Sequence, residues 1–126
     1  MTQSQFLDHS SIQATVQKYL DGFIGQQPPL LRKAFHPHAK LKSINEGRVE
    51  ETLCTDWFAK VEARRQSGAV PTFAEAAILG IDQVDGAAVA KVEIKFATHS
   101  FVDYLSLLKG LEGWIIVSKI YVVREQ

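Results

Sequence analysis

The sequence of 126 residues lacks several common features. Cys54 is its only cysteine, which excludes a disulfide within the chain and a zinc site built from several thiolates. No run approaches the roughly 20 apolar residues that span a bilayer, and the polar start MTQSQFLDHSS does not have the form of a signal peptide. Basic and acidic residues balance at 14 each, so no charge excess favours nucleic acid or an anionic membrane. We therefore expect a cytoplasmic protein without a metal or cofactor, whose partners are a small molecule or another protein.

The chain does contain enough apolar sequence for one core. Its hydrophobic content is 46% and its charged content 22%, which are ordinary values for a globular protein. Its length corresponds to about one domain. We expect residues 1–126 to form a single domain.

The first half of the chain has helical periodicity. Apolar residues after Ser10 follow the spacing of one helical face, and Ser10 with Gln13 has the pattern of a capping box. A short second helix is expected in LLRKAF. A third is expected from about residue 52 to 66, with Gly68 as its cap. Between them, AKLKSI and GRVEE predict a strand pair that turns at Asn45 to Gly47.

From Thr72 onward the apolar period changes to two, which is typical of strands. One hairpin is predicted to turn at Asp85–Gly86. A second joins FVDYLSLLK to WIIVSKIYVV through GLEG, and both of its strands are apolar on both faces. Such a sheet needs two covers, so we expect the helices on one side and a second copy of the chain on the other.

A turn at Glu112–Gly113 would pair Tyr104 with Tyr121 and Ser106 with Lys119. These four residues would share one face, and Asp103 would lie on the other. Burying an unpaired lysine is costly, so the face of Lys119 must offer a pocket, a carboxylate partner or solvent. We expect Lys119, Tyr104 and Tyr121 to form a polar cluster, and Asp103 to be a structural hydrogen-bond acceptor near the open end of the hairpin.

The order of three helices followed by a long sheet resembles the nuclear transport factor 2-like (cystatin-like) superfamily. The motifs YLDGF, FHPHA, FVDYLSLLK and GWIIVSKIY resemble its putative lumazine-binding branch, over nearly the whole chain. The resemblance implies an α+β, cone-shaped domain with three N-terminal helices packed on a curved, mostly antiparallel sheet. It also implies a pocket between helices and sheet and a homodimer through the sheet, but no particular activity.

The resemblance allows a comparison with ketosteroid isomerase, a member of the superfamily. That enzyme needs a general base, an oxyanion tyrosine and a neutral carboxylic acid. The tyrosine position falls on Tyr19, but the base position falls on Ser43 and the acid position on or near Leu105 rather than Asp103. With two of three groups missing, an isomerase of that mechanism is not expected.

Other chemistry has weaker support in the sequence. His36 and His38 could begin a metal site on an extended segment, although a solvated loop is the simpler interpretation. Cys54 could be activated by a helix N-terminus or be a small buried hydrophobe. A dehydratase or cyclase would need a histidine close to an aspartate, for which the candidates are His36, His38 or His99 with Asp56 or Asp103.

Aromatic residues favour a ligand pocket, because a planar heterocycle stacks well on such walls. We expect a protein that binds a small, planar organic ligand between helices and sheet. The alternatives are an isomerase, dehydratase or cyclase-like enzyme of the same fold, and a non-catalytic dimerisation module. The candidate pocket residues are Tyr19, Phe23, Phe35, His36, Trp57, Phe58, Tyr104, Lys119 and Tyr121.

Overall fold

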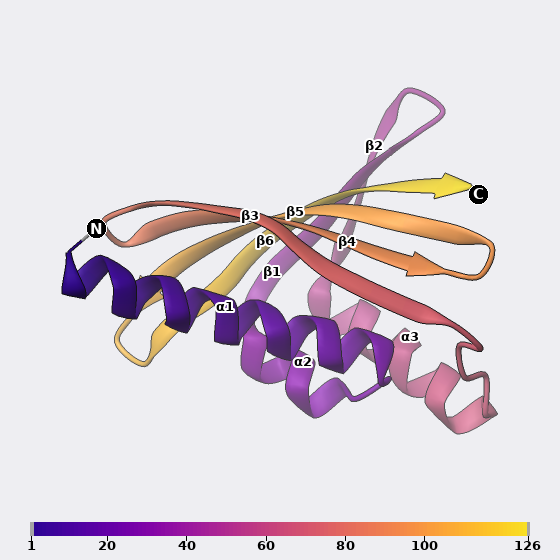
Figure 1. Cartoon of the computed structure of the whole chain (residues 1–126). Coiled ribbons are helices and arrows are strands. Elements are labelled where there is room, and N and C mark those ends of the chain that lie inside the picture. The colour runs from indigo at the N-terminus through magenta and orange to yellow at the C-terminus, as the bar shows by residue number, and fades with distance from the viewer. Residues whose placement is uncertain (1, 126) are drawn as a thin grey trace.

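Three helices cover one face of a six-stranded sheet in the computed structural model, which describes residues 2–125 (Figure 1). The helices are α1 (Gln3–Ile24), α2 (Pro28–Ala34) and α3 (Cys54–Ser67). The strands are β1 (Phe35–Asn45), β2 (Arg48–Leu53), β3 (Ala74–Val84), β4 (Ala87–Phe96), β5 (His99–Gly110) and β6 (Gly113–Glu125). This arrangement confirms the expected α+β fold class.

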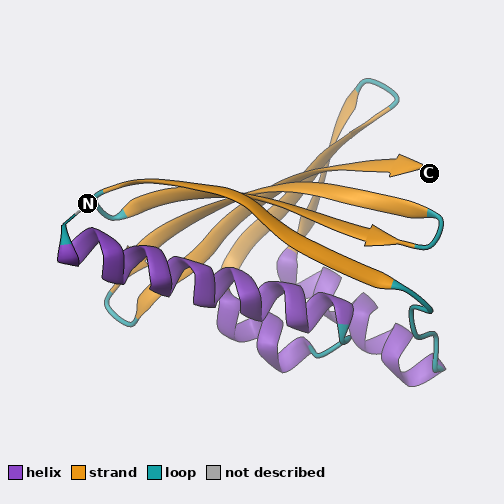
Figure 2. Cartoon of the chain, viewed as in Figure 1, coloured by secondary structure: helices purple, strands orange, loops and turns teal. Residues whose placement is uncertain are grey.

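The sheet is mixed, with the strand order β2-β1-β6-β5-β4-β3. Only the pair β1 and β6 is parallel within the described part of the chain. All three helices lie on the same side of the sheet, and the β1–β2 hairpin projects beyond its other face (Figure 2). The sheet therefore has an inner face against the helices and an outer face that no described helix covers. No described helix has the length and apolarity of a membrane span.

Helix α1 begins seven residues before the predicted start at Ser10. Its capping box is formed by Thr2 and Gln5: Thr2 Oγ1 accepts from the Gln5 N–H at 3.1 Å, and Gln5 Oε1 accepts from the Thr2 N–H at 2.9 Å. The prediction of a cap at Ser10 and Gln13 is wrong. The apolar side chains of the first two helical turns are not buried against the sheet, and Phe6 is 61% exposed. The sequence of these turns therefore has no apolar periodicity that could predict the helix.

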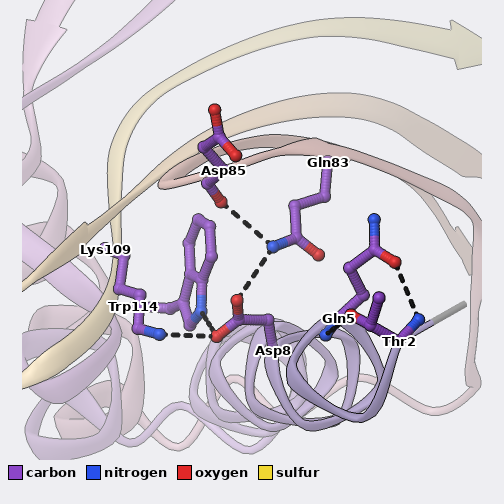
Figure 3. A network of polar contacts seen from close by, with 7 residues as sticks. All are labelled: Thr2, Gln5, Asp8, Gln83, Asp85, Lys109 and Trp114. Atoms are coloured by element: carbon purple, nitrogen blue, oxygen red, sulfur yellow. Dashed lines mark hydrogen bonds and ion pairs between the residues drawn. The ribbon is translucent and has the colours of Figure 1, made fainter.

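The side chain of Asp8 joins these additional N-terminal turns of α1 to the sheet (Figure 3). Its Oδ1 accepts from Lys109 Nζ at 2.8 Å and from Trp114 Nε1 at 3.2 Å, and its Oδ2 accepts from Gln83 Nε2 at 3.0 Å. The hydrogen bond from Lys109, followed by that from Trp114, lowers the pKa of the Asp8 carboxyl. One carboxylate thus joins α1 to the ends of both long hairpins.

The other short elements follow the sequence closely. The β1–β2 hairpin turns where predicted, with Asn45 paired to Arg48 and Gly47 at a φ of 77°. Gly68 caps α3 in the left-handed region at a φ of 78°. Strand β1, however, begins at Phe35, so the predicted loop around His36 and His38 belongs to a strand.

The hairpin of β5 and β6 departs from the predicted register in two ways. Its turn is Leu111–Glu112, because Gly110 pairs with Gly113. Val117 is then an extra residue on β6, because Leu107 pairs with Ile116 and Ser106 with Ser118. The shifted turn alone would keep every face assignment, but this β-bulge reverses the faces of all later residues in β6.

The bulge divides the predicted polar cluster. Lys119 pairs with Leu105 and lies on the inner face with Asp103, whereas Tyr104 pairs with Ile120 on the outer face. Tyr104 is 42% exposed, Ile120 52% and Lys119 3%. The predicted cluster of Lys119 with Tyr104 is therefore wrong, and the carboxylate partner that a buried lysine needs comes from Asp103.

Candidate functional site

Three polar side chains meet in the core between α1 and the inner face of the sheet. Tyr19 on α1 donates a short hydrogen bond to Asp103 Oδ2 on β5. Lys119 Nζ on β6 donates to the Tyr19 hydroxyl at 2.8 Å and lies 3.9 Å from Asp103 Oδ2. Tyr19 and Asp103 have no exposed surface. We call these three residues the buried triad.

Burial sets the electrostatics of the buried triad. It raises the pKa of the Asp103 carboxyl, although the charge of Lys119 and the hydrogen bond from Tyr19 act in the opposite direction. It lowers the pKa of the Lys119 amine to about 8, against the charge of Asp103. It also raises the pKa of the Tyr19 phenol, helped by the charge of Asp103. All three groups are therefore pushed toward their neutral forms.

Aromatic rings surround the Lys119 amine. Its Nζ lies 4.4 Å from the ring centroid of Trp57, 4.8 Å from Tyr19, 5.1 Å from Tyr121 and 5.3 Å from Phe23. Ring faces at these distances attract a cation and exclude water. Within residues 2–125, nothing donates a hydrogen bond to Asp103 Oδ1. The site thus holds a shielded amine and an unused acceptor, a combination that is costly for stability alone.

The buried triad changes the comparison with ketosteroid isomerase. Asp103, not Leu105, supplies a carboxyl next to Tyr19, a contact that the comparison by sequence position did not predict. Its role as a hydrogen-bond acceptor is confirmed. The tyrosine proton is directed at Asp103, whereas an oxyanion site needs donors directed at a substrate. Ser43, at the base position, lines a groove on the outer side of the sheet.

A cavity of about 560 Å³ opens at the end of the molecule where α1 and α3 end. We call it the mouth cavity. Its walls come from the end of α1, the α3–β3 connection and the β4–β5 turn, and four phenylalanines contribute: Phe23, Phe73, Phe96 and Phe101. Arg64 and His99 add polar groups. Phe23 belongs both to this wall and to the rings around Lys119, so the cavity and the surroundings of the amine share one side chain.

A second depression of about 890 Å³ lies on the outer face, between the β1–β2 hairpin and the ends of β5 and β6. We call it the outer groove. Its apolar lining includes Ile44, Val49 and Ile120, which are 66%, 69% and 52% exposed. Its charged residues are Lys42 and Glu50.

The predicted pocket residues fall in four places. Phe23 lines the mouth cavity, and Tyr104 and Tyr121 line the outer groove. His36 is exposed on β1. The remaining five are buried in the core: Tyr19, Phe35, Trp57, Phe58 and Lys119. Sequence reasoning did not select Phe96 and Phe101, although two aromatics that flank one hairpin turn are a pattern it could have used.

The predicted histidine and cysteine sites do not assemble. Among the hydrogen bonds of residues 2–125, His36 Nδ1 accepts from the His38 N–H at 3.0 Å, and His99 Nδ1 lies 3.1 Å from Thr98 Oγ1. No described histidine bonds to Asp56 or Asp103, and no third ligand joins His36 and His38 in this part of the chain. Burial raises the pKa of the Cys54 thiol, as for a small buried hydrophobe.

Solved structures define the class of this fold. A nuclear transport factor 2-like protein of unknown function from Shewanella baltica is 25% identical, with a TM-score of 0.84 over 100% of this chain and 99% of that one. A domain with a cystatin-like fold from Nostoc punctiforme is 17% identical, with a TM-score of 0.73 over 97% and 78%. A ketosteroid isomerase-like protein from Erwinia carotovora is 15% identical, with a TM-score of 0.69 over 90% and 94%. The protein is a nuclear transport factor 2-like α+β domain.

The family follows from the sequence itself. Residues 7–122 match the family described as "Putative lumazine-binding", which covers most of the chain. The chain belongs to this family. A comparison with curated proteins finds no match.

Proposed function

We propose that the protein binds a small, planar organic molecule in the mouth cavity. The observation that carries the proposal is the wall of four phenylalanines around a volume of about 560 Å³. Pockets for small ligands typically enclose about 300 to 1,000 Å³ and combine apolar walls with a few polar groups. The edge-to-face contacts of Phe23 with Phe96 and Phe101, at 5.9 and 5.8 Å, hold the wall in one arrangement.

The polar groups favour a heterocycle over a plain hydrocarbon. His99 stacks on Phe96 at 5.2 Å and presents a ring nitrogen, and the exposed Arg64 presents a guanidinium. Planar rings with carbonyl or ring nitrogen atoms at their edges can stack on the phenylalanines and accept hydrogen bonds from these groups. Lumazines, other pteridines and flavins have this chemistry, and the family description agrees with it.

Thermal-shift and isothermal titration measurements with lumazine, a pterin, a flavin and a steroid test this proposal. We expect at least one planar heterocycle to raise the Tm of the wild type in a concentration-dependent way. Phe101→Ala removes one wall of the mouth cavity and should weaken binding at least tenfold. Phe6→Ala, on the exposed start of α1, is the matched control and should leave the affinity unchanged. If the two variants bind the ligand with equal affinity, the ligand does not bind in the mouth cavity.

We further propose that a second copy of the chain covers the outer groove. The exposed apolar residues of this face, among them Ile44, Val49 and Ile120, support an isologous contact. Lys42 and Glu50 have opposite charges at the same groove, so a two-fold axis can pair each with the other in the partner.

Light scattering after size exclusion tests the dimer. Ile120→Glu should yield monomers, whereas Leu111→Glu, at the fully exposed β5–β6 turn, should leave the dimer intact. A wild type that is monomeric at micromolar concentration would refute this proposal.

A further inference from the structure

The amine of Lys119 has an unusual setting for a lysine. Lysines are almost never fully buried unless they are paired, and Lys119, which is 3% exposed, has a single long ion pair, with Asp103 Oδ2 at 3.9 Å from its Nζ. Its one hydrogen bond to a described residue is to the Tyr19 hydroxyl, at 2.8 Å. An amine that is held among rings, with a long ion pair and a hydroxyl that accepts from it, can lose its proton and act as a nucleophile.

We infer that Lys119 forms a reversible imine with a ligand that carries an aldehyde or ketone and occupies the mouth cavity. The inference rests on the proposed function, because the mouth cavity must first hold the ligand. It identifies the ligand class more closely, as a planar carbonyl compound. It also assigns Lys119 a covalent role that simple binding does not require.

The bond changes balance without an oxidant or reductant. The free amine attacks the carbonyl carbon, a C–N bond forms, and a proton moves from nitrogen to oxygen to give a carbinolamine. The C–O bond then breaks and water leaves, so that amine and carbonyl become imine and water. The Tyr19 hydroxyl contacts Nζ and directs its own proton at Asp103, so these two side chains can take up and return the proton that moves.

The charged and titratable groups around Nζ support a supply of free amine. They are Tyr19 from α1, Asp103 from β5 and Tyr121 from β6, and α3 contributes the neutral ring of Trp57. With a pKa of about 8, roughly a quarter of Lys119 is free amine near pH 7.5. For an ordinary exposed lysine this fraction is about a thousandth.

Phe23 is the side chain shared by the mouth cavity and the rings around Nζ. Its ring lies 5.3 Å from Nζ and also lines the mouth cavity, and it is 8% exposed. Rotation of this side chain would connect the mouth cavity to the amine without movement of the backbone. A smaller residue at this position should therefore make Lys119 react faster.

Reductive trapping of the wild-type protein tests the inference directly. The probe is 2-naphthaldehyde with sodium cyanoborohydride near pH 7.5, and the labelled lysines are identified by peptide mapping. Lys91 is the internal reference, because it is exposed on β4 and its Nζ lies 5.7 Å from the Tyr104 ring. We expect Lys119 to be labelled at least tenfold faster than Lys91. Phe23→Ala should raise the Lys119 rate severalfold and leave the Lys91 rate unchanged.

Tyr19→Phe keeps the ring and removes the hydroxyl that contacts Nζ. It should slow labelling of Lys119 about tenfold and alter its pH profile, while Lys91 is unaffected. Labelling of Lys119 no faster than Lys91 in both the wild type and Phe23→Ala would overturn the inference.

A planar heterocycle without an aldehyde or ketone separates this failure from failure of the proposed function. If lumazine, the pterin or the flavin raises the Tm of the wild type but the aldehyde does not favour Lys119, the cavity binds planar molecules and the imine inference alone is refuted. If none of these heterocycles binds and the aldehyde does not favour Lys119, both the proposed function and the inference are refuted.

Discussion

Lys119→Met should change how the stability of the protein depends on pH. Methionine has nearly the length of lysine and no charge, so it can occupy the same space among the rings of Trp57, Tyr19, Phe23 and Tyr121. In the wild type, burial disfavours the charged amine and lowers its pKa to about 8. The variant has no such group, so the difference between the two proteins reports the titration of Lys119 together with any change that its loss causes in the pKa of Asp103.

The sign and size of the effect follow from the two pKa values. Between its folded pKa of about 8 and its ordinary value of 10.5, Lys119 binds more protons in the unfolded chain than in the folded one. Stability therefore rises with pH in this window and is lost as the pH falls through about 8. From about pH 7.5 to about pH 9.5, the wild type should gain about 2 kcal/mol of unfolding free energy relative to Lys119→Met.

Urea unfolding at several pH values across this range measures the difference. The slope m should be the same for both proteins, so that midpoints report stability. Lys91→Met is the matched control, because it removes an exposed lysine from β4 and should give a curve parallel to the wild type. A constant difference between wild type and Lys119→Met across the range would show that the pKa of Lys119 is ordinary and would refute the reasoning.

Two further predictions concern how α1 is held. Asp8→Asn removes the charge that accepts from Lys109 and Trp114. The pKa of Asp8 in the folded protein lies below its ordinary value of 3.8, so the ionised carboxylate stabilises the fold above that pH. The variant should therefore have the lower Tm at pH 7. Calorimetry should show this gap closing as the pH falls below about 3.8; a gap independent of pH would exclude the ionic contribution. Gly22→Ala would place a Cβ 2.9 Å from the buried Leu31 side chain. We expect urea unfolding to show a loss of about 1 to 3 kcal/mol from overpacking, and a stability equal to or above that of the wild type would contradict this contact.

Much of the fold could be predicted because local patterns agree with tertiary structure. The turns at Asn45 to Gly47 and Asp85–Gly86 lie where predicted, because each contains residues suited to a positive φ. The apolar alternation in β5 correctly placed Asp103 and Leu105 on one face. These features depend on a few neighbouring residues, which the sequence displays directly.

The site could not be predicted to the same extent, because it depends on one extra residue. GLEG can turn at Leu111–Glu112 or at Glu112–Gly113, and both turns leave the same faces inward. The sequence WIIVSKIYVV around the bulge at Val117 is an unbroken run of strand residues without glycine or proline, so nothing in it indicates a bulge. The sequence required a pocket, a carboxylate partner or solvent for Lys119, but it did not identify Asp103 as that partner.

The bulge at Val117 also has a consequence for how such domains diverge. The extra residue lets Ile116 and Lys119, three positions apart, both face inward. Regular pairing of the same sequence without a bulge would turn Lys119 toward the outer groove. Ile120 and Val122 would then enter the core, and the middle of this strand would present no charged residue to it. Formation or loss of one bulge can therefore create or remove a polar centre in this fold without replacing any residue of it, and sequence identity alone would not register the change.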